Sequence, residues 1–483
     1  MNDRRRTRKS DALAAVFFSQ DLMLPEIVTV IPGPRSRECA EKLSRFEARE
    51  VTWLASDFPV FWDRADGVNV WDVDGNRFLD FTSAFGVTGL GHGAGPIRSA
   101  LRVQAEKLLH AMGDVHPAAV KAELCEVLSR ITFERWEMGR GKTILCNSGS
   151  EAVEAALKTA LLHSGKPGVI SFAGGYHGLG LGALETIGMP AFREPFQSQL
   201  ARFAVKLPYP SCFRCPFGRR EGFRLEGNPF PNCSTSCLEE LQEQILATLR
   251  QREIGCILVE PIQGRGGEVV PPRDFLVMLR RICDNEKLLL VLDEIYTGFN
   301  RTGKLFACEH FRITPDLICL GKSLTGGFPL SACVGRGDIM DAWPPSQGEA
   351  LHTSTTLGNP LGCAMALASI KEHLEDDTRH LARNVGRQLK DALLALKAPC
   401  VGNVRGVGAL LGVELVKRDG EPYSSLAAAV MRQALQDGLI LLGGGLHGNV
   451  LSFAPPFAIS GSEIEFLAAK LEDYLARLPG SIS

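Results

Sequence analysis

Between about residues 140 and 340, short apolar runs alternate with longer segments of helical periodicity. The runs are rich in Val, Ile and Leu without polar alternation, which is typical of strands that are covered on both faces. The segments between them, such as 151–163 and 275–285, have apolar residues at helical spacing. This succession predicts a mainly parallel sheet with helices on both sides and with ligands at the carboxyl ends of the strands. The runs are 143–146, 169–172, 256–259, 288–292, 317–320 and 332–334.

The two flanks of this region have a different pattern. Residues 68–81 contain Asp74-Gly75-Asn76 between two strand-like runs, which predicts a hairpin. Residues 400–483 mix strand-like and helix-like segments. We therefore expect a smaller α+β domain that is built from both chain ends. The predicted division is a flexible tail over 1–30, a first part of the small domain over 31–90, a large domain over 91–375 with a cysteine-rich insertion at 208–238, and the rest of the small domain over 376–483.

Composition excludes several classes of protein. Apolar residues make up 45% of the 483 residues and charged residues 22%, so the chain can bury a core and is not mainly disordered. A net charge of −2 provides no basic field for nucleic acid or an anionic membrane. No apolar run approaches the ~20 residues of a membrane span. The basic, then apolar, first 18 residues resemble a weak signal peptide, but no small-x-small cleavage site follows. Most of the 14 cysteines lie singly in apolar segments, which indicates the reducing cytoplasm.

The first candidate for chemistry is the segment CNSGSEAVE, residues 146–154. An apolar run ends at Asn147, and Ser148-Gly149-Ser150 begins a predicted helix. Free backbone N–H groups and the positive end of the helix dipole make such a terminus a phosphate cup, to which the serine hydroxyls add donors. A serine N-cap followed by a glutamate is also an ordinary capping box, so this segment alone leaves both interpretations open.

Two charged residues lie at the ends of predicted buried strands. Asp293 ends the run 288–292, and a carboxylate there needs a cationic partner such as a protonated pyridine nitrogen. A structural salt bridge or a helix cap would satisfy it equally. Lys322 follows the run 317–320, so its amine would lie at the carboxyl edge of the sheet. Desolvation there lowers the pKa of an amine and suits Schiff-base chemistry, whereas the alternative is a lysine that reaches solvent.

A phosphate cup, a strand-end acid and a strand-end lysine are together what pyridoxal 5′-phosphate (PLP) requires. In these residues the chain resembles the class III aminotransferases of PLP fold-type I, and most of all their 4-aminobutyrate and ornithine aminotransferase branch. The resemblance runs from about residue 33 to residue 475. It implies an α/β fold, with a large PLP-binding domain around a mainly parallel sheet and a smaller α+β domain. The motifs that carry it are VWDVDGNRFLDF, CNSGSEAVEAALK, ISFAGGYHG, LVEPIQGRGG, LDEIYTGFNRTGK, PDLICLGKSLTGG and HTSTTLGNPLGCA.

The resemblance implies a role in cofactor binding for several residues. Lys322 matches the lysine that forms the Schiff base, and Asp293 matches the acid that pairs with the pyridine nitrogen. Residues Ser148, Gly149 and Ser150 match the phosphate loop. Tyr176 matches the aromatic residue stacked on the ring, and Ile295 matches the aliphatic residue on its opposite face.

The resemblance also implies substrate contacts and an assembly. Glu260 matches an acid near cofactor and substrate, and Arg405 matches an arginine that binds a substrate carboxylate. Thr355 matches a threonine that reaches the phosphate from a neighbouring subunit. The family is a homodimer or larger, with active sites at the subunit interface.

Three departures from the family pattern concern the substrate. Leu179 stands where many relatives have an arginine for the carboxylate remote from the reacting amine. Arg265 replaces the glutamate of a Gln-Gly-Glu motif, and Tyr296 replaces a common glutamine. Neither a 4-aminobutyrate nor an ornithine assignment can therefore be carried over. Arg265, Arg405 and Arg193 are candidates for carboxylate recognition, with a surface arginine as the alternative.

A separate cysteine-rich segment, residues 212–237, has paired close cysteines. Cys212-x2-Cys215 precedes Cys233-x3-Cys237, a pattern that fits a structural Zn²⁺ site. Four free or redox-active thiols are the alternative. We do not expect this segment to take part in the reaction.

The predicted function is PLP-dependent transamination from an amino acid or ω-amino acid to a 2-oxo acid, in which Lys322 acts as general base. A PLP-dependent racemase or aminomutase would use the same lysine and acid but return the proton to the substrate. A non-catalytic PLP-fold regulator is a third class, which the intact Lys322, Asp293 and phosphate loop disfavour. The expected partners are an amino donor, a 2-oxo acid and a second copy of the chain.

Overall fold

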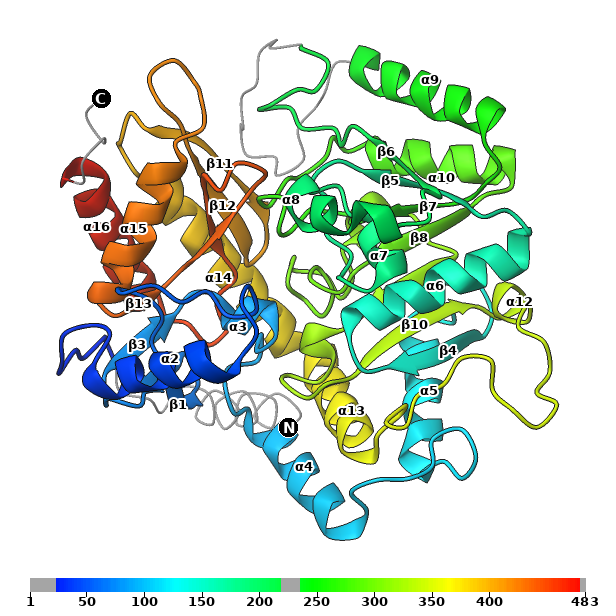
Figure 1. The fold of residues 1–483 in the computed structure, drawn as a ribbon, viewed down its shortest axis with the longest axis horizontal. Helices are drawn as coiled ribbons and strands as arrows, with labels where there is room; N and C mark the ends of the chain where they lie inside the picture. The colour runs from blue at the N-terminus through cyan, green and yellow to red at the C-terminus, as the bar shows by residue number, and fades with distance from the viewer. Residues whose placement is uncertain (1–22, 219–234, 478–483) are drawn as a thin grey trace, which may run out of the picture.

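The computed structural model describes residues 23–218 and 235–477. A seven-stranded sheet lies at the centre of the larger lobe (Figure 1). All of its strands are parallel except β10, which is antiparallel to both neighbours. In sheet order they are β4 (Gly141–Cys146), β10 (Ser331–Arg336), β9 (Leu317–Leu320), β8 (Leu289–Asp293), β7 (Ile254–Val259), β5 (Gly168–Phe172) and β6 (Ala204–Leu207).

The structure confirms all six predicted strands and both predicted helices, α6 (Gly149–Ser164) and α10 (Phe275–Glu286). It adds the edge strand β6, whose four residues AVKL include a lysine and so break the apolar run that a buried strand shows. The reversed direction of β10 was not predicted either. The sequence of a short apolar run does not indicate whether the strand runs parallel or antiparallel to its neighbours.

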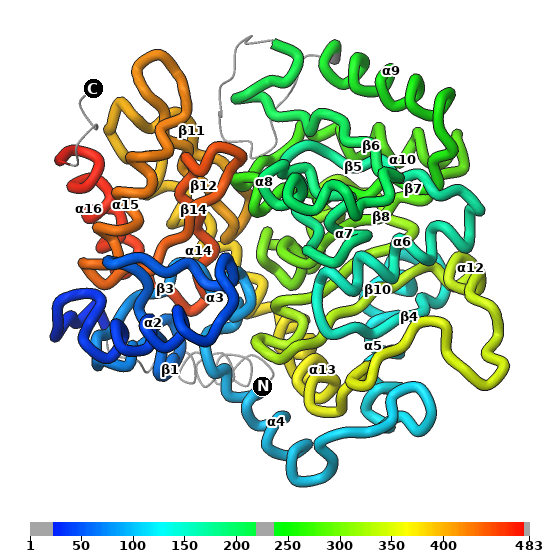
Figure 2. The backbone as a smooth tube through the Cα atoms, in the orientation of Figure 1, coloured from blue at the N-terminus to red at the C-terminus, as the bar shows by residue number. Residues whose placement is uncertain are grey.

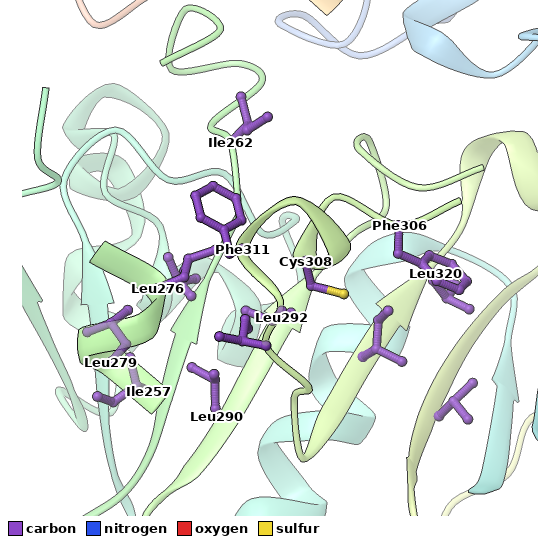
Figure 3. Close-up of a cluster of buried hydrophobic side chains, with 14 of the residues drawn as sticks. Ile257, Ile262, Leu276, Leu279, Leu290, Leu292, Phe306, Cys308, Phe311 and Leu320 are labelled. Atoms are coloured by element: carbon purple, nitrogen blue, oxygen red, sulfur yellow. The ribbon is translucent and has the colours of Figure 1, made fainter. Parts of the chain in front are cut away.

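Helices cover both faces of the central sheet because successive strand residues point to opposite sides. Leu290 and Leu292 of β8 belong to one buried cluster with α10 and α5 (Ala119–Ile131), whereas Leu289 and Val291 belong to a second cluster with α6. Figure 3 shows part of the first cluster, in which Leu276 and Leu279 of α10 lie beside strand side chains. This two-sided burial explains why the strands read as continuous apolar runs.

The smaller lobe contains segments from both chain ends. Strand β13 (Leu439–Ile440) pairs in parallel with β3 (Arg77–Asp80), which forms the predicted hairpin with β2 (Asn69–Asp72). Figure 2 shows these blue and orange segments side by side. Strand β1 (Trp62–Asp66) completes this sheet, and the second sheet has the order β11 (Val401–Val407), β12 (Leu410–Leu415), β15 (Val450–Phe453) and β14 (Leu442–Gly444).

The predicted domain boundaries stay predictions, and most of the predicted tail lies outside the described residues. No helix in the described part of the chain is long and apolar enough to cross a lipid bilayer. The remaining helices are α2 (Pro34–Phe46), α3 (Ser83–Gly86), α4 (Gly95–Lys107), α7 (Leu181–Thr186), α8 (Pro190–Arg193), η1 (Glu194–Gln199), α9 (Thr235–Gln251), α11 (Cys308–Phe311), η2 (Lys322–Leu324), α12 (Gly337–Met340), α13 (Pro360–Leu374), α14 (Asp376–Leu394), α15 (Ser424–Gln436) and α16 (Gly461–Arg477).

Candidate active site

A cavity of about 520 Å³ lies where the parallel strands of the central sheet end. Most of its polar lining comes from residues at or just after the carboxyl ends of β4, β5, β7, β8 and β9, because parallel strands bring these ends to one edge. Ser452 of β15 adds a hydroxyl from the smaller lobe. The lining includes the following residues predicted from the sequence: Ser148, Gly149, Ser150, Tyr176, Glu260, Asp293, Ile295 and Lys322. Arg405 and Thr355 are not part of it.

The phosphate cup and the capping box are both present at the start of α6. Ser148 is the N-cap, and its Oγ accepts a hydrogen bond from the Glu151 backbone at 3.3 Å. The Glu151 carboxylate in turn accepts from Asn147 N at 2.9 Å. The backbone N–H groups of Gly149 and Ser150 have no acceptor among the described residues, and both residues line the cavity. This pair of unfilled donors at a helix N-terminus fits a phosphate group.

Asp293 is the last residue of β8 and is only 4% exposed. Its Oδ2 lies 2.9 Å from Nδ1 of His177, and its Oδ1 accepts from Ile295 N at 3.1 Å. An ionised carboxylate accepts only, so the histidine carries the proton on Nδ1 and donates it. These two donors hold the carboxylate in place at the cavity wall. A buried acid in this position fits the protonated ring nitrogen of PLP.

Tyr176 and Ile295 line the cavity and are the predicted ring-stacking residues. Tyr176 packs edge-on against Phe192, with ring centroids 5.5 Å apart. Ile295 fills the space above two glycines. A Cβ on Gly149 would lie 2.9 Å from Ile295 Cδ1, and one on Gly321 would lie 3.3 Å from Ile295 Cγ2. The isoleucine therefore has a fixed place beside the unfilled N–H groups of α6.

Lys322 follows β9 in the short helix η2, with a left-handed φ of 46°. Strained backbone at a residue without a glycine's freedom is typical of functional positions. Burial lowers the pKa of Lys322 to about 8, although Asp293 and Glu260 raise it. Arg265 and Arg301 lower it further. A lysine amine that is partly unprotonated near neutral pH suits both imine formation with the PLP aldehyde and proton transfer.

Two buried glutamates line the cavity beside these groups. Both carboxylate oxygens of Glu260 accept backbone hydrogen bonds, from Tyr176 N at 2.9 Å and from Gly264 N at 3.0 Å. Burial raises the pKa of Glu260 to about 7. Glu268 has a left-handed φ of 51° and accepts from Ser452 Oγ at 3.0 Å, and burial raises its pKa to about 8.

Glu268 and His177 were not singled out from the sequence. His177 belongs to the motif ISFAGGYHG and lies one residue after the predicted stacking tyrosine. Glu268 follows directly after the motif LVEPIQGRGG. A glutamate after two glycines is the signal that could have pointed to it, because glycines allow close approach of the backbone to a ligand.

The three candidate arginines lie in different places. Arg265 lines the cavity, with its guanidinium 5.3 Å from the ring centroid of Tyr176 and 4.9 Å from that of Phe192. Arg405 lies outside the lining, where Nε donates to Gly267 O at 2.7 Å and the guanidinium pairs with buried Glu414. Arg193 also lies outside the lining and donates to a backbone carbonyl.

Thr355 is exposed and does not line the cavity of its own chain. Its neighbours Ser354 and Thr356 hydrogen bond to the Asn147 side chain, at 3.1 and 2.9 Å. The predicted contact of Thr355 with a phosphate in a second subunit stays a prediction.

Of the predicted zinc ligands, Cys233 lies outside the described residues. The Sγ atoms of Cys215 and Cys237 are 3.5 Å apart, and Cys212 lies in the same segment. Within residues 23–218 and 235–477, no three His, Cys, Asp or Glu side chains are grouped so as to hold a metal. The zinc site therefore stays a prediction.

Comparisons with known proteins bear on the whole arrangement. The sequence profile of the family described as aminotransferase class-III matches residues 53–475. A 4-aminobutyrate aminotransferase of Mycobacterium leprae is 36% identical, over 94% of this chain and 98% of that protein. A leucine/methionine racemase of Thermococcus litoralis is 33% identical, over 92% of this chain and 96% of that protein.

A solved structure is also similar. The PLP-bound form of an amine transaminase from an uncultivated Pseudomonas species has a TM-score of 0.79 at 29% identity, and the match covers 90% of this chain and 98% of that one. This likeness confirms the predicted fold class, PLP fold-type I.

Proposed function

The chain belongs to the class-III aminotransferases, and we propose that its cavity prefers an amino donor whose remote end is apolar or uncharged. The protein is a PLP-dependent transaminase that moves an amino group from a donor to a 2-oxo acid. Bound PLP supplies an acceptor for the electrons released when the amine-bearing carbon loses its proton. The observation that carries the residue assignments is the meeting of Lys322, Asp293 and the unfilled N–H groups of Gly149 and Ser150 around one cavity.

Each of these residues has one proposed task. Gly149 N, Ser150 N and the serine hydroxyls hold the phosphate, while Tyr176 and Ile295 enclose the ring. Asp293 keeps the ring nitrogen protonated by its negative charge. Lys322 Nζ takes the proton from the amine-bearing carbon and returns a proton in the second half of the reaction.

The assignment of Lys322 is tested by substitution and by product analysis. We expect Lys322→Ala to abolish turnover. Wild type mixed with one enantiomer of an amino donor, without a 2-oxo acid, should form at most one carbonyl product per subunit. The racemase relatives make the alternative concrete. Appearance of the opposite enantiomer, without carbonyl product, would assign racemisation instead.

The substrate proposal rests on Leu179, which lines the cavity and is 53% exposed. A carboxylate that faces leucine lacks a charge-assisted hydrogen bond worth ~1.5–3 kcal/mol, or about tenfold or more in specificity. 4-Aminobutyrate, which the Mycobacterium leprae relative is named for, should therefore be a poorer donor than an apolar primary amine.

The experiment compares kcat/KM for 4-aminobutyrate, ornithine, a β-amino acid and an apolar primary amine, in wild type and in Leu179→Arg. The variant should gain on the donors that carry a remote carboxylate, 4-aminobutyrate among them, and should not gain on the apolar primary amine. Leu181→Arg is a matched control, because Leu181 is similarly exposed but does not line the cavity. If 4-aminobutyrate is the best wild-type donor and Leu179→Arg gains nothing, the remote carboxylate is bound elsewhere.

For the carboxylate of the 2-oxo acid, we propose Arg265 as the binding group. Arg265 lines the cavity, whereas Arg405 lies outside the lining and pairs with Glu414. Arg265→Gln should raise KM for the 2-oxo acid about tenfold or more. A larger rise of this KM in Arg405→Gln would instead support carboxylate binding by Arg405, as the resemblance implies.

Two further proposals concern the oligomeric state and the cellular location of the protein. We propose a homodimer, because the apolar side chain of Phe85 lines the cavity and is 55% exposed in a single chain. We propose a cytoplasmic location, since most of the described cysteines are buried among apolar side chains, as is typical of cysteines that act as small hydrophobic residues.

A further inference from the structure

The amine of Lys322 lies over the ring of Tyr296. Tyr296 follows β8 by three residues and lines the cavity. The Nζ atom of Lys322 lies 3.8 Å from the centroid of its ring. A cation above a ring face at this distance is attracted by the negative face of the π-system.

Two glycines fix the ring in this position. A Cβ on Gly86 would lie 2.2 Å from Tyr296 Cε2, and a Cβ on Gly264 would lie 2.1 Å from Cδ1. Both distances are far shorter than any real carbon contact, so the two edges of the ring occupy space that only glycine leaves open. Gly86 comes from α3 and Gly264 from the loop after β7, so separate parts of the chain form this slot.

The groups around Lys322 act on its ammonium form in opposite directions. Asp293 and Glu260 favour its ammonium form, while burial, Arg265 and Arg301 oppose it. Glu260 accepts two backbone hydrogen bonds, and Asp293 accepts from His177 and Ile295 N.

The tyrosine itself stays a neutral phenol. Burial raises the pKa of Tyr296, and the nearby acids Glu268, Asp80 and Glu260 raise it further, while Arg301 lowers it. Its ring face therefore offers attraction to a cation without competing for the proton.

We propose that Tyr296 is a positioning residue for Lys322, whose ring face holds the ammonium form of the lysine at the reaction centre. The inference rests on the proposed role of Lys322 as the group that takes up and returns a proton. When Nζ gains the proton it becomes an ammonium, and the ring stabilises that state where the proton must be returned. Without the ring the amine would give up its proton more readily and would lose its fixed place.

The test measures the pKa of Lys322 in the full-length protein freed of PLP. Competitive labelling with trace acetic anhydride, quantified at Lys322 by peptide mass spectrometry across pH, gives this value without any need for turnover. Removing a cation–π contact of ~0.5–2 kcal/mol lowers the pKa by roughly 0.4–1.5 units. In Tyr296→Leu, the labelling of Lys322 at pH 7 should therefore rise about 2- to 8-fold from its value at a wild-type pKa of about 8, while exposed Lys287 is unchanged.

Matched variants distinguish the effect of the Tyr296 ring on the pKa of Lys322 from the effect of its hydroxyl. Tyr296→Phe keeps the ring face and should leave the pKa of Lys322 as in wild type. Gly264→Ala should displace the ring and lower the pKa in the same direction as Tyr296→Leu. Gly95→Ala is the control, because a Cβ there has open space around it. If Tyr296→Leu does not fold, Gly264→Ala against Gly95→Ala decides the question.

Two results would overturn the proposal. One is a wild-type pKa of Lys322 in both Tyr296→Leu and Gly264→Ala. The other is a fall in the pKa of Lys322 that is as large in Tyr296→Phe as in Tyr296→Leu, which would assign the effect to the hydroxyl. In either case, loss of turnover in Lys322→Ala would still support the proposed function, so the two failures are distinguishable.

Discussion

Asp293 lines the cavity, and the proposed function gives its negative charge the task of holding the ring nitrogen protonated. Asp293→Asn keeps the volume of the side chain but removes the charge that would hold the ring nitrogen protonated. We expect kcat to fall at least ~100-fold, the size found for single preorganised electrostatic groups. Steady-state kinetics at saturating PLP measures this fall.

The neighbouring acid provides a control for Asp293. Glu294 is equally buried but accepts from Thr297 and from backbone N–H groups, and it does not line the cavity. Glu294→Gln should lower the melting temperature and leave kcat close to wild type. A near-normal rate in Asp293→Asn would show that another acid serves the nitrogen.

Glu268 makes stability depend on pH. Burial raises its pKa from 4.5 to about 8, so the folded protein keeps a proton that the unfolded chain releases between these values. Unfolding releases the proton in this window, and stability falls as the pH rises through it. Glu268→Gln should therefore reduce the loss of melting temperature between pH 5 and about pH 8.

The control for Glu268 is Glu123→Gln, at an exposed position on α5. It should reproduce the wild-type pH dependence of melting. Glu260 contributes in the same direction as Glu268, since burial raises its pKa to about 7, so some dependence should persist in Glu268→Gln. If the melting temperature of Glu268→Gln depends on pH as in wild type, the raised pKa of Glu268 is contradicted.

At the residue scale, the sequence predicts groups that end a strand and misses groups that reach the site from a loop. Asp293 and Lys322 each follow an apolar run, and the run alone is enough to place them at the carboxyl edge of the sheet. His177 and Glu268 follow irregular segments, and no periodicity determines where their side chains point. Arg405 lies in β11, and its pairing with Glu414 depends on the register between β11 and β12, which a single sequence does not determine.

At the element scale, the start of α6 has two functions that substitution can separate. Ser148 Oγ caps the helix by accepting from Glu151 N, and its hydrogen remains available to a phosphate oxygen. Ser148→Ala should destabilise the helix by ~1 kcal/mol. It should also weaken PLP binding about tenfold or more, as expected for a hydrogen bond to a charged group.

Ser460 provides the matched control for Ser148. It directly precedes α16, where its Oγ accepts from Glu463 N at 3.3 Å, and it does not line the cavity. Ser460→Ala should lower the melting temperature to a similar extent and leave PLP affinity unchanged, as measured by fluorescence titration. Equal PLP affinity in both variants would limit Ser148 to capping.

The same elements show how far a pattern determines a fold. Strands β5, β7, β8 and β9 are predicted because burial on both faces requires continuous apolar runs. The edge strand β6 is buried on fewer sides, so AVKL carries little signal. The hairpin at residues 68–81 is predicted from its turn, in which Asp72 Oδ1 accepts from Asp74 N at 3.0 Å and Asn76 N at 2.8 Å.

At the scale of the whole molecule, buried Arg301 links the segment after β8 to the smaller lobe. Its guanidinium donates to Pro455 O at 2.6 Å and to Ala409 O at 3.3 Å, and it lies 4.9 Å from the ring of Phe457. It also lies close enough to Lys322 to lower the pKa of that lysine. The same side chain therefore contacts the smaller lobe and contributes to the electrostatics of the cavity.

The surface of the larger lobe leads to the last prediction, an obligate dimer. Large apolar side chains are exposed on two adjoining segments, Leu109 (61%) and Met112 (55%) on one and Leu351 (70%) on the other. The segments are joined by hydrogen bonds from Thr353 to Asp114 and from Asn359 to Leu109 O. An apolar patch of this kind is typical of an interface with another protein.

A second copy of the chain is the partner that the family resemblance implies, with exposed Thr355 close to the patch in sequence. Sedimentation at micromolar concentration should give at least twice 52.4 kDa for wild type. Leu351→Asp should shift the protein toward the monomer and lower its PLP affinity, since Thr355 would leave the partner's phosphate. Leu394→Asp, at an exposed apolar position at the end of α14, should stay dimeric. A fully active wild-type monomer would contradict both the interface and the role of Thr355, because a site complete within one chain needs no threonine from another.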